Sequence, residues 1–228
     1  MGIPRCHNYR WVLWYRPRAY QRVKKVKLMN KSVTEIYDNI ANWFDNARDK
    51  SLVEETILEK LLSELKDQPD ILDLGCGTGE PIAKYLIEKG SKITGVDGAQ
   101  QMIEKARNRF PDHVWLHQDM RRIDLDKKFD AILCWDSLFH LNCEDQRAMF
   151  NIFESHAKEN CVLLFSCGSK LGEAWSPMYG FEGVDMYHAS LDSDEYLRIL
   201  KHYGYEILIQ EENDPTCGHR AYFLAKRK

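Results

Sequence analysis

The stretch Ile71-Leu72-Asp73-Leu74-Gly75-Cys76-Gly77-Thr78-Gly79-Glu80-Pro81 decides the fold of this chain. Its first four residues form a short apolar run typical of a buried strand, and Glu80-Pro81 opens a helical pattern with a proline near the first turn. The glycines between them permit positive φ angles and let a ligand approach the backbone where a β-carbon would collide. A strand, a tight glycine turn and a helix in this order predict a nucleotide-binding corner.

The spacing of the glycines selects among nucleotide cofactors. A dinucleotide fingerprint is G-x-G-x-x-G, and its third glycine would fall at position 80, where this chain has Glu80. A carboxylate there would also oppose a pyrophosphate at the helix N-terminus. No Gly-Lys-Ser/Thr follows, so the loop is not a Walker phosphate loop. S-adenosylmethionine has no phosphate and carries a cationic sulfonium and an amino group, which are compatible with an acidic rim.

Strand-like and helical segments alternate along most of the chain. Apolar runs predict strands at 71–74, 93–96, 114–116, 129–135, 161–166, 205–210 and 221–225. Helical patterns lie at 32–47, 51–66, 81–89, 99–110, 144–158 and 192–203. Such alternation predicts an α/β fold whose doubly wound, mostly parallel sheet is covered on both faces. Only about ten residues separate the last two strands, too few for a helical crossover, so we expect an antiparallel pair at one edge.

The composition fits one domain with a sizeable core. The chain has 228 residues, of which 44% are hydrophobic. No run approaches the roughly 18 apolar residues that span a bilayer, and the early run 11–15 is too short for a signal-peptide core. We therefore expect a cytoplasmic protein without a membrane span. The seven cysteines include no Cys-x-x-Cys pair, which favours reduced thiols and no metal site.

Charge is divided unevenly along the chain. Residues 1–31 carry nine Lys or Arg and no Asp or Glu, and the remaining 197 residues carry 23 basic against 35 acidic side chains. An acidic body argues against a broad nucleic-acid surface, while a basic arm permits contact with RNA, anionic lipid or an acidic partner. We interpret residues 1–31 as a disordered arm or an upstream extension, with Met29 as a second start, attached to a domain at 32–228.

Residues 73–79 resemble the first motif of class I S-adenosylmethionine-dependent methyltransferases, (Asp/Glu)-x-Gly-x-Gly-x-Gly, with Asp73, Gly75, Gly77 and Gly79 at the matching positions. The resemblance covers residues 34–226 and is to small bacterial members of that superfamily. It implies a seven-stranded Rossmann-like sheet of strand order 3-2-1-4-5-7-6 with an antiparallel strand 7. It also implies S-adenosyl-L-methionine as the cofactor and S-adenosyl-L-homocysteine as the product.

The same resemblance assigns cofactor contacts after the second and third strands. Asp97 ends the run 93–96, where a carboxylate can accept both ribose hydroxyls; its alternative role is to cap the helix that follows. Asp119-Met120 follows the third strand, where the family binds the adenine amino group with an acidic side chain; the alternative is an ordinary loop aspartate. Met102 either covers the adenine face or belongs to the core.

The fourth strand delivers Trp135, Asp136 and His140 to the sulfonium, because ligands bind beyond the carboxyl ends of parallel strands. Methyl transfer from a sulfonium is an in-line displacement that positioning and desolvation can accelerate. A base is needed only if the acceptor must lose its proton early. His140, Asp136 and His188 are the candidate bases, and packing or capping is the alternative for each.

The stretch 168–190 lacks regular periodicity and is rich in Gly, Tyr, Trp and Met, which predicts a lid. Trp175 and Tyr179 in this lid, together with Tyr37, are candidates for an aromatic wall around the acceptor and the methyl donor. Arg48 is a candidate for pairing with an acidic group of the substrate, or else a surface ion-pair residue.

The residues after the fourth strand also bear on the acceptor. Nucleic-base enzymes that attack exocyclic nitrogen carry Asn-Pro-Pro-aromatic there, and cytosine-carbon enzymes carry Pro-Cys, whereas this chain has Asp136-Ser137-Leu138-Phe139. These absences favour a small-molecule acceptor with an oxygen or nitrogen nucleophile. The alternatives are an RNA or protein methyltransferase recruited through the basic arm, a non-catalytic cofactor-binding module, and an NAD-dependent oxidoreductase, against which Glu80 counts.

Overall fold

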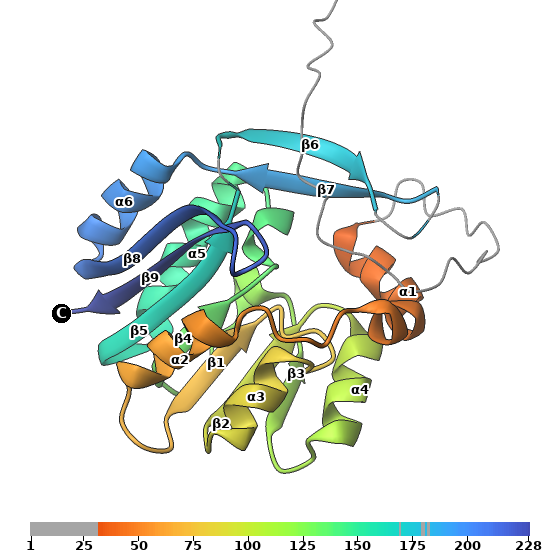
Figure 1. The fold of residues 1–228 in the computed structure, drawn as a ribbon, viewed down its shortest axis with the longest axis horizontal. Helices are drawn as coiled ribbons and strands as arrows, with labels where there is room; N and C mark the ends of the chain where they lie inside the picture. Colours follow the sequence, from red (N-terminus) through yellow and green to blue (C-terminus); the bar gives the residue numbers. More distant parts are fainter. Residues whose placement is uncertain (1–31, 169, 179–180, 182) are drawn as a thin grey trace, which may run out of the picture.

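The fold is built on one seven-stranded sheet (Figure 1). A computed structural model describes residues 32–168, 170–178, 181 and 183–228. The strands of the sheet are β1 (Asp70–Leu74), β2 (Lys92–Asp97), β3 (Val114–His117), β4 (Phe129–Cys134), β5 (Ala157–Cys167), β8 (Tyr205–Asp214) and β9 (Arg220–Arg227).

The strand order is β3-β2-β1-β4-β5-β9-β8. The first five strands are mutually parallel, β9 is antiparallel to β5, and β8 is antiparallel to β9. This is the order 3-2-1-4-5-7-6, with β8 and β9 as the sixth and seventh strands. The predicted doubly wound sheet and its antiparallel edge pair are therefore confirmed.

Helices cover both faces of the sheet and form two separate cores. They are α1 (Val33–Ala47), α2 (Glu55–Ser63), α3 (Ile82–Glu88), α4 (Gln100–Arg109), α5 (Cys143–His156) and α6 (Ser193–His202), with short 3₁₀ turns η1 (Met120–Arg122) and η2 (Leu138–His140). Apolar residues of α2, α3 and α4 pack on one face, and those of α5 and α6 pack on the other. Among the described residues, every helix is too short or too polar to cross a lipid bilayer.

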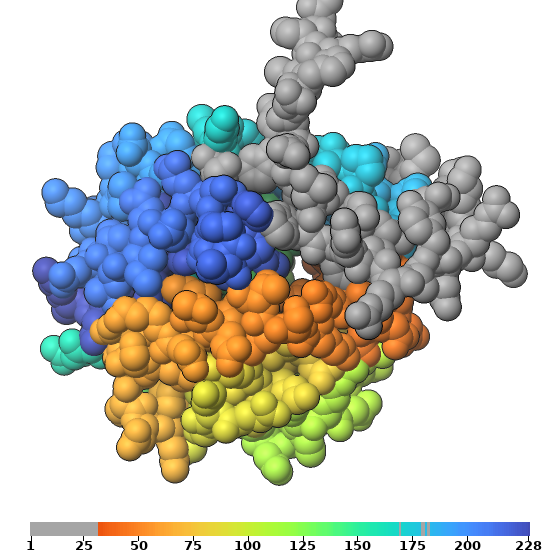
Figure 2. All heavy atoms as spheres, in the orientation of Figure 1, coloured from red at the N-terminus to blue at the C-terminus, as the bar shows by residue number. Residues whose placement is uncertain are grey.

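Helix α1 lies outside these two layers and closes over the carboxyl end of the sheet. Ser32 and Glu35 form a reciprocal capping box at its start, and its side chains Ile36 and Ile40 are buried. The Asp38 carboxylate accepts the backbone N–H of Gln101 at 2.8 Å, so that α1 caps the first turn of α4. Figure 2 shows the orange N-terminal segment lying between the yellow and green first half of the fold and the blue C-terminal part.

The stretch predicted as an irregular lid contains a β-hairpin instead. Strands β6 (Gly172–Pro177) and β7 (Asp185–Ser190) pair antiparallel and form a second, two-stranded sheet. The expectation of no regular structure was therefore wrong for both strands. Figure 1 shows the hairpin lying across the same end of the sheet as α1. Residues of the two elements share a small core that includes Ile36, Val184 and Met186.

The base of the hairpin is fastened to the body of the domain. The Ser190 hydroxyl lies 3.1 Å from both the N–H and the carbonyl oxygen of Gly168, so one side chain joins the two ends of the insertion. The amide of the fully buried Gln146 donates to the carbonyl of Ala189 at 2.9 Å. The insertion is therefore fixed to the domain where it begins and where it ends.

Candidate functional site

The candidate site lies at the carboxyl end of β1, where the strand order reverses. Because β1 pairs with both β2 and β4, the residues that end these three strands meet at one place. The glycine loop begins by turning back onto β2, since the N–H groups of Gly75 and Cys76 both donate to the carbonyl of Val96, at 2.7 and 3.1 Å. This turn exposes the loop backbone toward the space beyond the strands.

Gly75 satisfies two requirements that no other residue type meets. Its φ angle is 79°, in the left-handed region, and a β-carbon at this position would lie 2.2 Å from Cβ of Ser137. The Ser137 hydroxyl in turn donates to the carbonyl of Leu74 at 2.7 Å. The β4 loop is therefore packed directly against the glycine loop.

Asp97 binds both the glycine loop and the start of α4. Its Oδ2 accepts the N–H of Gly77 at 2.9 Å, and its Oδ1 accepts the N–H of Ala99 at 2.8 Å. Ala99 itself is the N-cap residue of α4 and provides no side-chain cap. Burial raises the pKa of Asp97, and the two backbone donors oppose that rise. Each carboxylate oxygen still has a free lone pair for a ligand hydroxyl.

Asp73 is a buried carboxylate without a hydrogen-bond partner among the described residues. Its exposed fraction is 5%, and burial, reinforced by the nearby charge of Asp97, raises its pKa to about 7. Among the described residues, the charge of Arg48 opposes this rise. Two neighbouring carboxylates with this little compensation favour a ligand that brings positive charge.

Glu80 does not act as sequence reasoning supposed. Its carboxylate pairs with Lys50 at 2.5 Å and lies 3.7 Å from Arg109. These cations, the hydrogen bond from Lys50 first, lower the pKa of Glu80 and balance its charge. The charge of Glu80 is therefore no argument against a pyrophosphate at this loop. Only the glycine spacing still distinguishes the loop from dinucleotide-binding loops.

The expected adenine contacts have competing partners in this structure. Asp119 forms a two-pronged ion pair with Arg121, with contacts of 2.9 and 2.6 Å, and this hydrogen bonding lowers its pKa. Met102 is buried against Ala41 of α1, which favours its core role. The terminal carbon of Met120 would lie 3.7 Å from a β-carbon on Gly75, so Met120 borders the loop as expected.

His140 connects three elements of the site. Its Nδ1 lies 2.8 Å from the carbonyl of Tyr187, which can only accept, so Nδ1 carries the proton. Nε2 therefore accepts from the hydroxyl of Tyr37 at 3.1 Å, and this bond joins η2 to α1. Burial, and then the nearby imidazole of His188, lower the pKa of His140 to about 4. The side chain is neutral at physiological pH.

His188 lies beside His140, with ring centroids 5.0 Å apart. Its Nδ1 contacts the carbonyl of Met186 at 3.1 Å, which leaves Nε2 as an acceptor without a partner among the described residues. Burial lowers its pKa as well. The structure thus brings Tyr37, His140 and His188 together.

Asp136 is held in a form that opposes its expected role as a base. Both of its carboxylate oxygens accept from Arg220, at 2.9 and 2.7 Å. Burial alone would raise the pKa of Asp136, but the charge of Arg220 and these hydrogen bonds keep it below the usual value. A carboxylate so engaged is a poor proton acceptor.

Arg48 and Trp135 present unsatisfied donors. Nε of Arg48 and Nε1 of Trp135 are buried and have no hydrogen-bond partner in the described part of the chain. Arg48 forms no ion pair there, so its alternative role as a surface ion-pair residue was wrong. Its charge acts instead on Tyr37, Asp73 and Asp136, which places it at the site.

The two aromatic candidates from the lid have different outcomes. Trp175 is 58% exposed and packs against Tyr187, its cross-strand partner. His188 is the next residue along β7, on the opposite face of the hairpin, so Trp175 points away from His188, and its substrate contact stays a prediction. Tyr179 lies outside the described residues, as does the basic arm 1–31.

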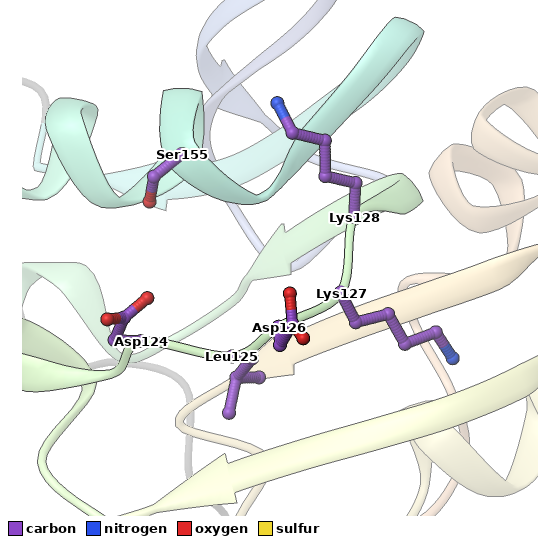
Figure 3. A pocket seen from close by; sticks show the side chains of 6 residues that line it. All are labelled: Asp124, Leu125, Asp126, Lys127, Lys128 and Ser155. Atoms are coloured by element: carbon purple, nitrogen blue, oxygen red, sulfur yellow. The ribbon is translucent and has the colours of Figure 1, made fainter.

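A hollow at the other end of the sheet offers no comparable chemistry. It is lined by Asp124, Leu125, Asp126, Lys127, Lys128 and Ser155, just before β4 begins (Figure 3). Its charges are of both signs, and Lys127 is already paired with Asp70 at 2.7 Å. Among the described residues, no group of three His, Cys, Asp or Glu side chains could hold a metal ion.

Relationships to known proteins agree with this geometry. The sequence model of a family described as a methyltransferase domain matches residues 71–160, from β1 into β5. The malonyl-[acyl-carrier protein] O-methyltransferase of Serratia marcescens is 29% identical over 69% of this chain and 62% of its own. Magnesium protoporphyrin IX methyltransferase (ChlM) from Synechocystis PCC 6803, solved with bound SAH, has a TM-score of 0.66 at 17% identity, over 86% of this chain and 98% of its own. Residues 71–160 thus match a methyltransferase domain, and the fold is similar to that of solved S-adenosylmethionine-dependent methyltransferases.

These matches support the predicted methyltransferase activity and the predicted S-adenosylmethionine cofactor. A further relative, the dTDP-3-amino-3,6-dideoxy-alpha-D-glucopyranose N,N-dimethyltransferase of Streptomyces fradiae, is 36% identical over 31% of this chain and 28% of its own. The chain spans about half the length of the curated relatives it matches. Their names give chemically different acceptors, so the acceptor must be sought in the site of this methyltransferase itself.

Proposed function

We propose that the protein transfers a methyl group from S-adenosylmethionine to the oxygen or nitrogen of a small molecule. The observation that carries this proposal is the pair of carboxylates beside the glycine loop, the buried Asp73 and the half-buried Asp97. Their raised pKa values mark negative charge that this structure leaves poorly compensated. A sulfonium and an ammonium group supply the missing positive charge.

The amino-acid end of S-adenosylmethionine also matches the groups around Asp73. This end is zwitterionic, with an ammonium and a carboxylate. Asp73 suits the ammonium, and Arg48, with its unsatisfied Nε, suits a carboxylate. Asp97 suits the ribose hydroxyls, because it ends β2 between the glycine loop, which its Oδ2 contacts, and the start of α4, which its Oδ1 contacts.

His140 is the proposed proton acceptor of the reaction. An acceptor molecule that displaces the Tyr37 hydroxyl would place its own N–H or O–H on Nε2 of His140. A base whose pKa is about 4 is too weak to ionise an alcohol before attack. It is adequate only for a weakly basic amine, such as an aromatic one, whose methylated form is an acid of comparable strength. A carboxylate acceptor would need no base.

We therefore infer that the acceptor carries an amine or a carboxylate. Methyl transfer breaks the bond between the sulfonium and the methyl carbon and forms a bond from that carbon to the nitrogen or oxygen. For an amine, the proton leaves to His140 Nε2. The protein then accelerates the transfer by holding the acceptor in line with the methyl group, between η2, α1 and the hairpin.

Two experiments test this function. Calorimetry should show micromolar binding of S-adenosylhomocysteine and no comparable binding of NAD; equal or tighter NAD binding contradicts the assignment. Transfer of labelled methyl to panels of amines, carboxylic acids and alcohols then tests the acceptor class. His140→Gln should reduce transfer to amines by about tenfold to a thousandfold while preserving cofactor affinity. Labelling of alcohols alone would contradict the inferred class.

A further inference from the structure

Asp136 has a backbone conformation that ordinary residues avoid. Its φ angle is 49°, in the left-handed region, although it is not a glycine. Such a conformation persists only where the surroundings hold it. Its N–H donates to the hydroxyl of Ser166 at 2.7 Å, and its carboxylate is gripped by Arg220.

Arg220 reaches this loop from the start of β9, 84 residues further along the chain. Its side chain is only 17% exposed, and Nη2 also lies 3.4 Å from the carboxylate of the buried Glu54, the residue before α2. Nη1 donates to the carbonyl of Cys217 at 3.3 Å, and the guanidinium lies over the Trp135 ring. The cation is therefore fixed on several sides before any ligand arrives.

The conformation of Asp136 determines where the next four residues lie. Ser137 follows it directly, bonds to the end of β1 and fills the space beside Gly75. The N–H of His140 then donates to the carbonyl of Ser137 at 3.0 Å and closes the η2 turn. A change at Asp136 would thus move both the glycine loop and the imidazole of His140.

We propose that Arg220 is a positioning residue of the methyltransferase site, which acts through Asp136. It holds the segment 136–140 in the one conformation that aligns the cofactor loop with His140. It also balances the charge of Asp136 near that imidazole. This inference rests on the proposed function, because the alignment matters only if the two ligands meet there.

The test compares three variants of the full chain. Arg220→Met removes both hydrogen bonds to the Asp136 carboxylate and leaves its charge unpaired. Asp136→Asn combined with Arg220→Met removes these hydrogen bonds together with the negative charge of Asp136. Arg227→Met is the matched control, because Arg227 stands on the same strand β9 and pairs with Glu154, at the end of the sheet away from the site.

Two readouts separate positioning from stability. One is S-adenosylhomocysteine affinity by calorimetry, and the other is the His140 titration by NMR of labelled histidine, assigned with His140→Gln. The groups facing His140 are Tyr37 from α1, His188 and the Tyr187 carbonyl from β7, and Asp136 from its own loop. Only the last is altered directly by these variants.

Arg220→Met should weaken S-adenosylhomocysteine binding by at least about tenfold and raise the pKa of His140, since an unpaired carboxylate favours the imidazolium. The double variant should restore the His140 titration but not the affinity. Arg227→Met should lower only the melting temperature. Binding within twofold of wild type by folded Arg220→Met, or full recovery of affinity in the double variant, would overturn the proposal.

If Arg220→Met does not fold, Arg220→Lys replaces it in the test, because Lys keeps the positive charge but cannot form two parallel hydrogen bonds to Asp136. It should bind S-adenosylhomocysteine several-fold more weakly with an unchanged His140 pKa, and unchanged binding contradicts the positioning role. If the wild-type protein does not bind S-adenosylhomocysteine, the proposed function fails instead. The His140 resonance of Arg220→Lys then still reports positioning, because a shift is expected and an unaltered resonance overturns it.

Discussion

Replacing Asp73 by Asn should stabilise the ligand-free protein at high pH while weakening cofactor binding. The raised pKa of Asp73 means that the folded protein holds a proton which the unfolded chain releases. The stabilisation that this proton provides is complete below the unfolded pKa of 3.8 and is lost as the pH rises to about 7. Asn cannot titrate and so does not suffer this loss.

The magnitude follows from the pKa shift. Each pH unit between the unfolded and folded pKa values is worth about 1.4 kcal/mol. Between pH 5 and pH 8, wild type should therefore lose about 2 to 3 kcal/mol of unfolding free energy relative to Asp73→Asn. Urea denaturation at several pH values measures this difference directly.

Asp70→Asn is a control on the same strand. Asp70 is paired with Lys127 and Lys158, which lower its pKa despite some burial. Its contribution to stability therefore has the opposite sign, present at neutral pH and lost in acid. Parallel pH profiles for wild type and Asp73→Asn would refute the reasoning, and so would unchanged S-adenosylhomocysteine affinity in Asp73→Asn.

Three further predictions concern packing and the closure of the site. Gly75→Ala should abolish S-adenosylhomocysteine binding in calorimetry, because its β-carbon would lie 2.2 Å from Cβ of Ser137. Gly90→Ala is the control, since Gly90 has a similar φ but open space around it, and this variant should lower the free energy of unfolding by only about 1 to 2 kcal/mol. Asp45→Ala should weaken ligand binding and lower the melting temperature, since this buried carboxylate pairs with Arg109 at 2.5 Å and so holds α1 to α4; an unchanged ligand off-rate would count against that role. Ser190→Ala should increase hydrogen exchange in β7 with little effect on the seven-stranded sheet, and protection equal to wild type would show that the base is held by other contacts.

Much of the fold could be predicted because its signals are local. Short apolar runs separated by helical patterns gave the central strands within a few residues of their ends. The hairpin β6–β7 could not be read in the same way. Most of β6 is exposed, and Gly172 and Pro177 stand at its ends, so neither burial nor strand propensity marks it in the sequence.

The site was predictable where a residue follows a strand that the motif fixes. Asp73 and Asp97 are of this kind, since strand position alone brings them to the loop. Arg220 and Glu54 were missed, because Arg220 contacts Asp136 and Glu54 across large separations in the chain, and no local sequence pattern indicates such contacts. The position of Asp119 after the third strand indicated an adenine contact, but its carboxylate is already paired with Arg121, which is only two residues away.

The single hydroxyl that joins residue 168 to residue 190 makes the hairpin an exchangeable cassette. The two ends of the insertion meet at this point, and the seven-stranded sheet and the glycine loop contain no residue of it, while its Tyr187 carbonyl contacts His140 of the body. Insertions of other lengths and sequences could therefore be grafted between Gly168 and Ser190 to recognise other acceptors. The chemistry of the methyl donor would stay with the part of the chain that the graft leaves untouched.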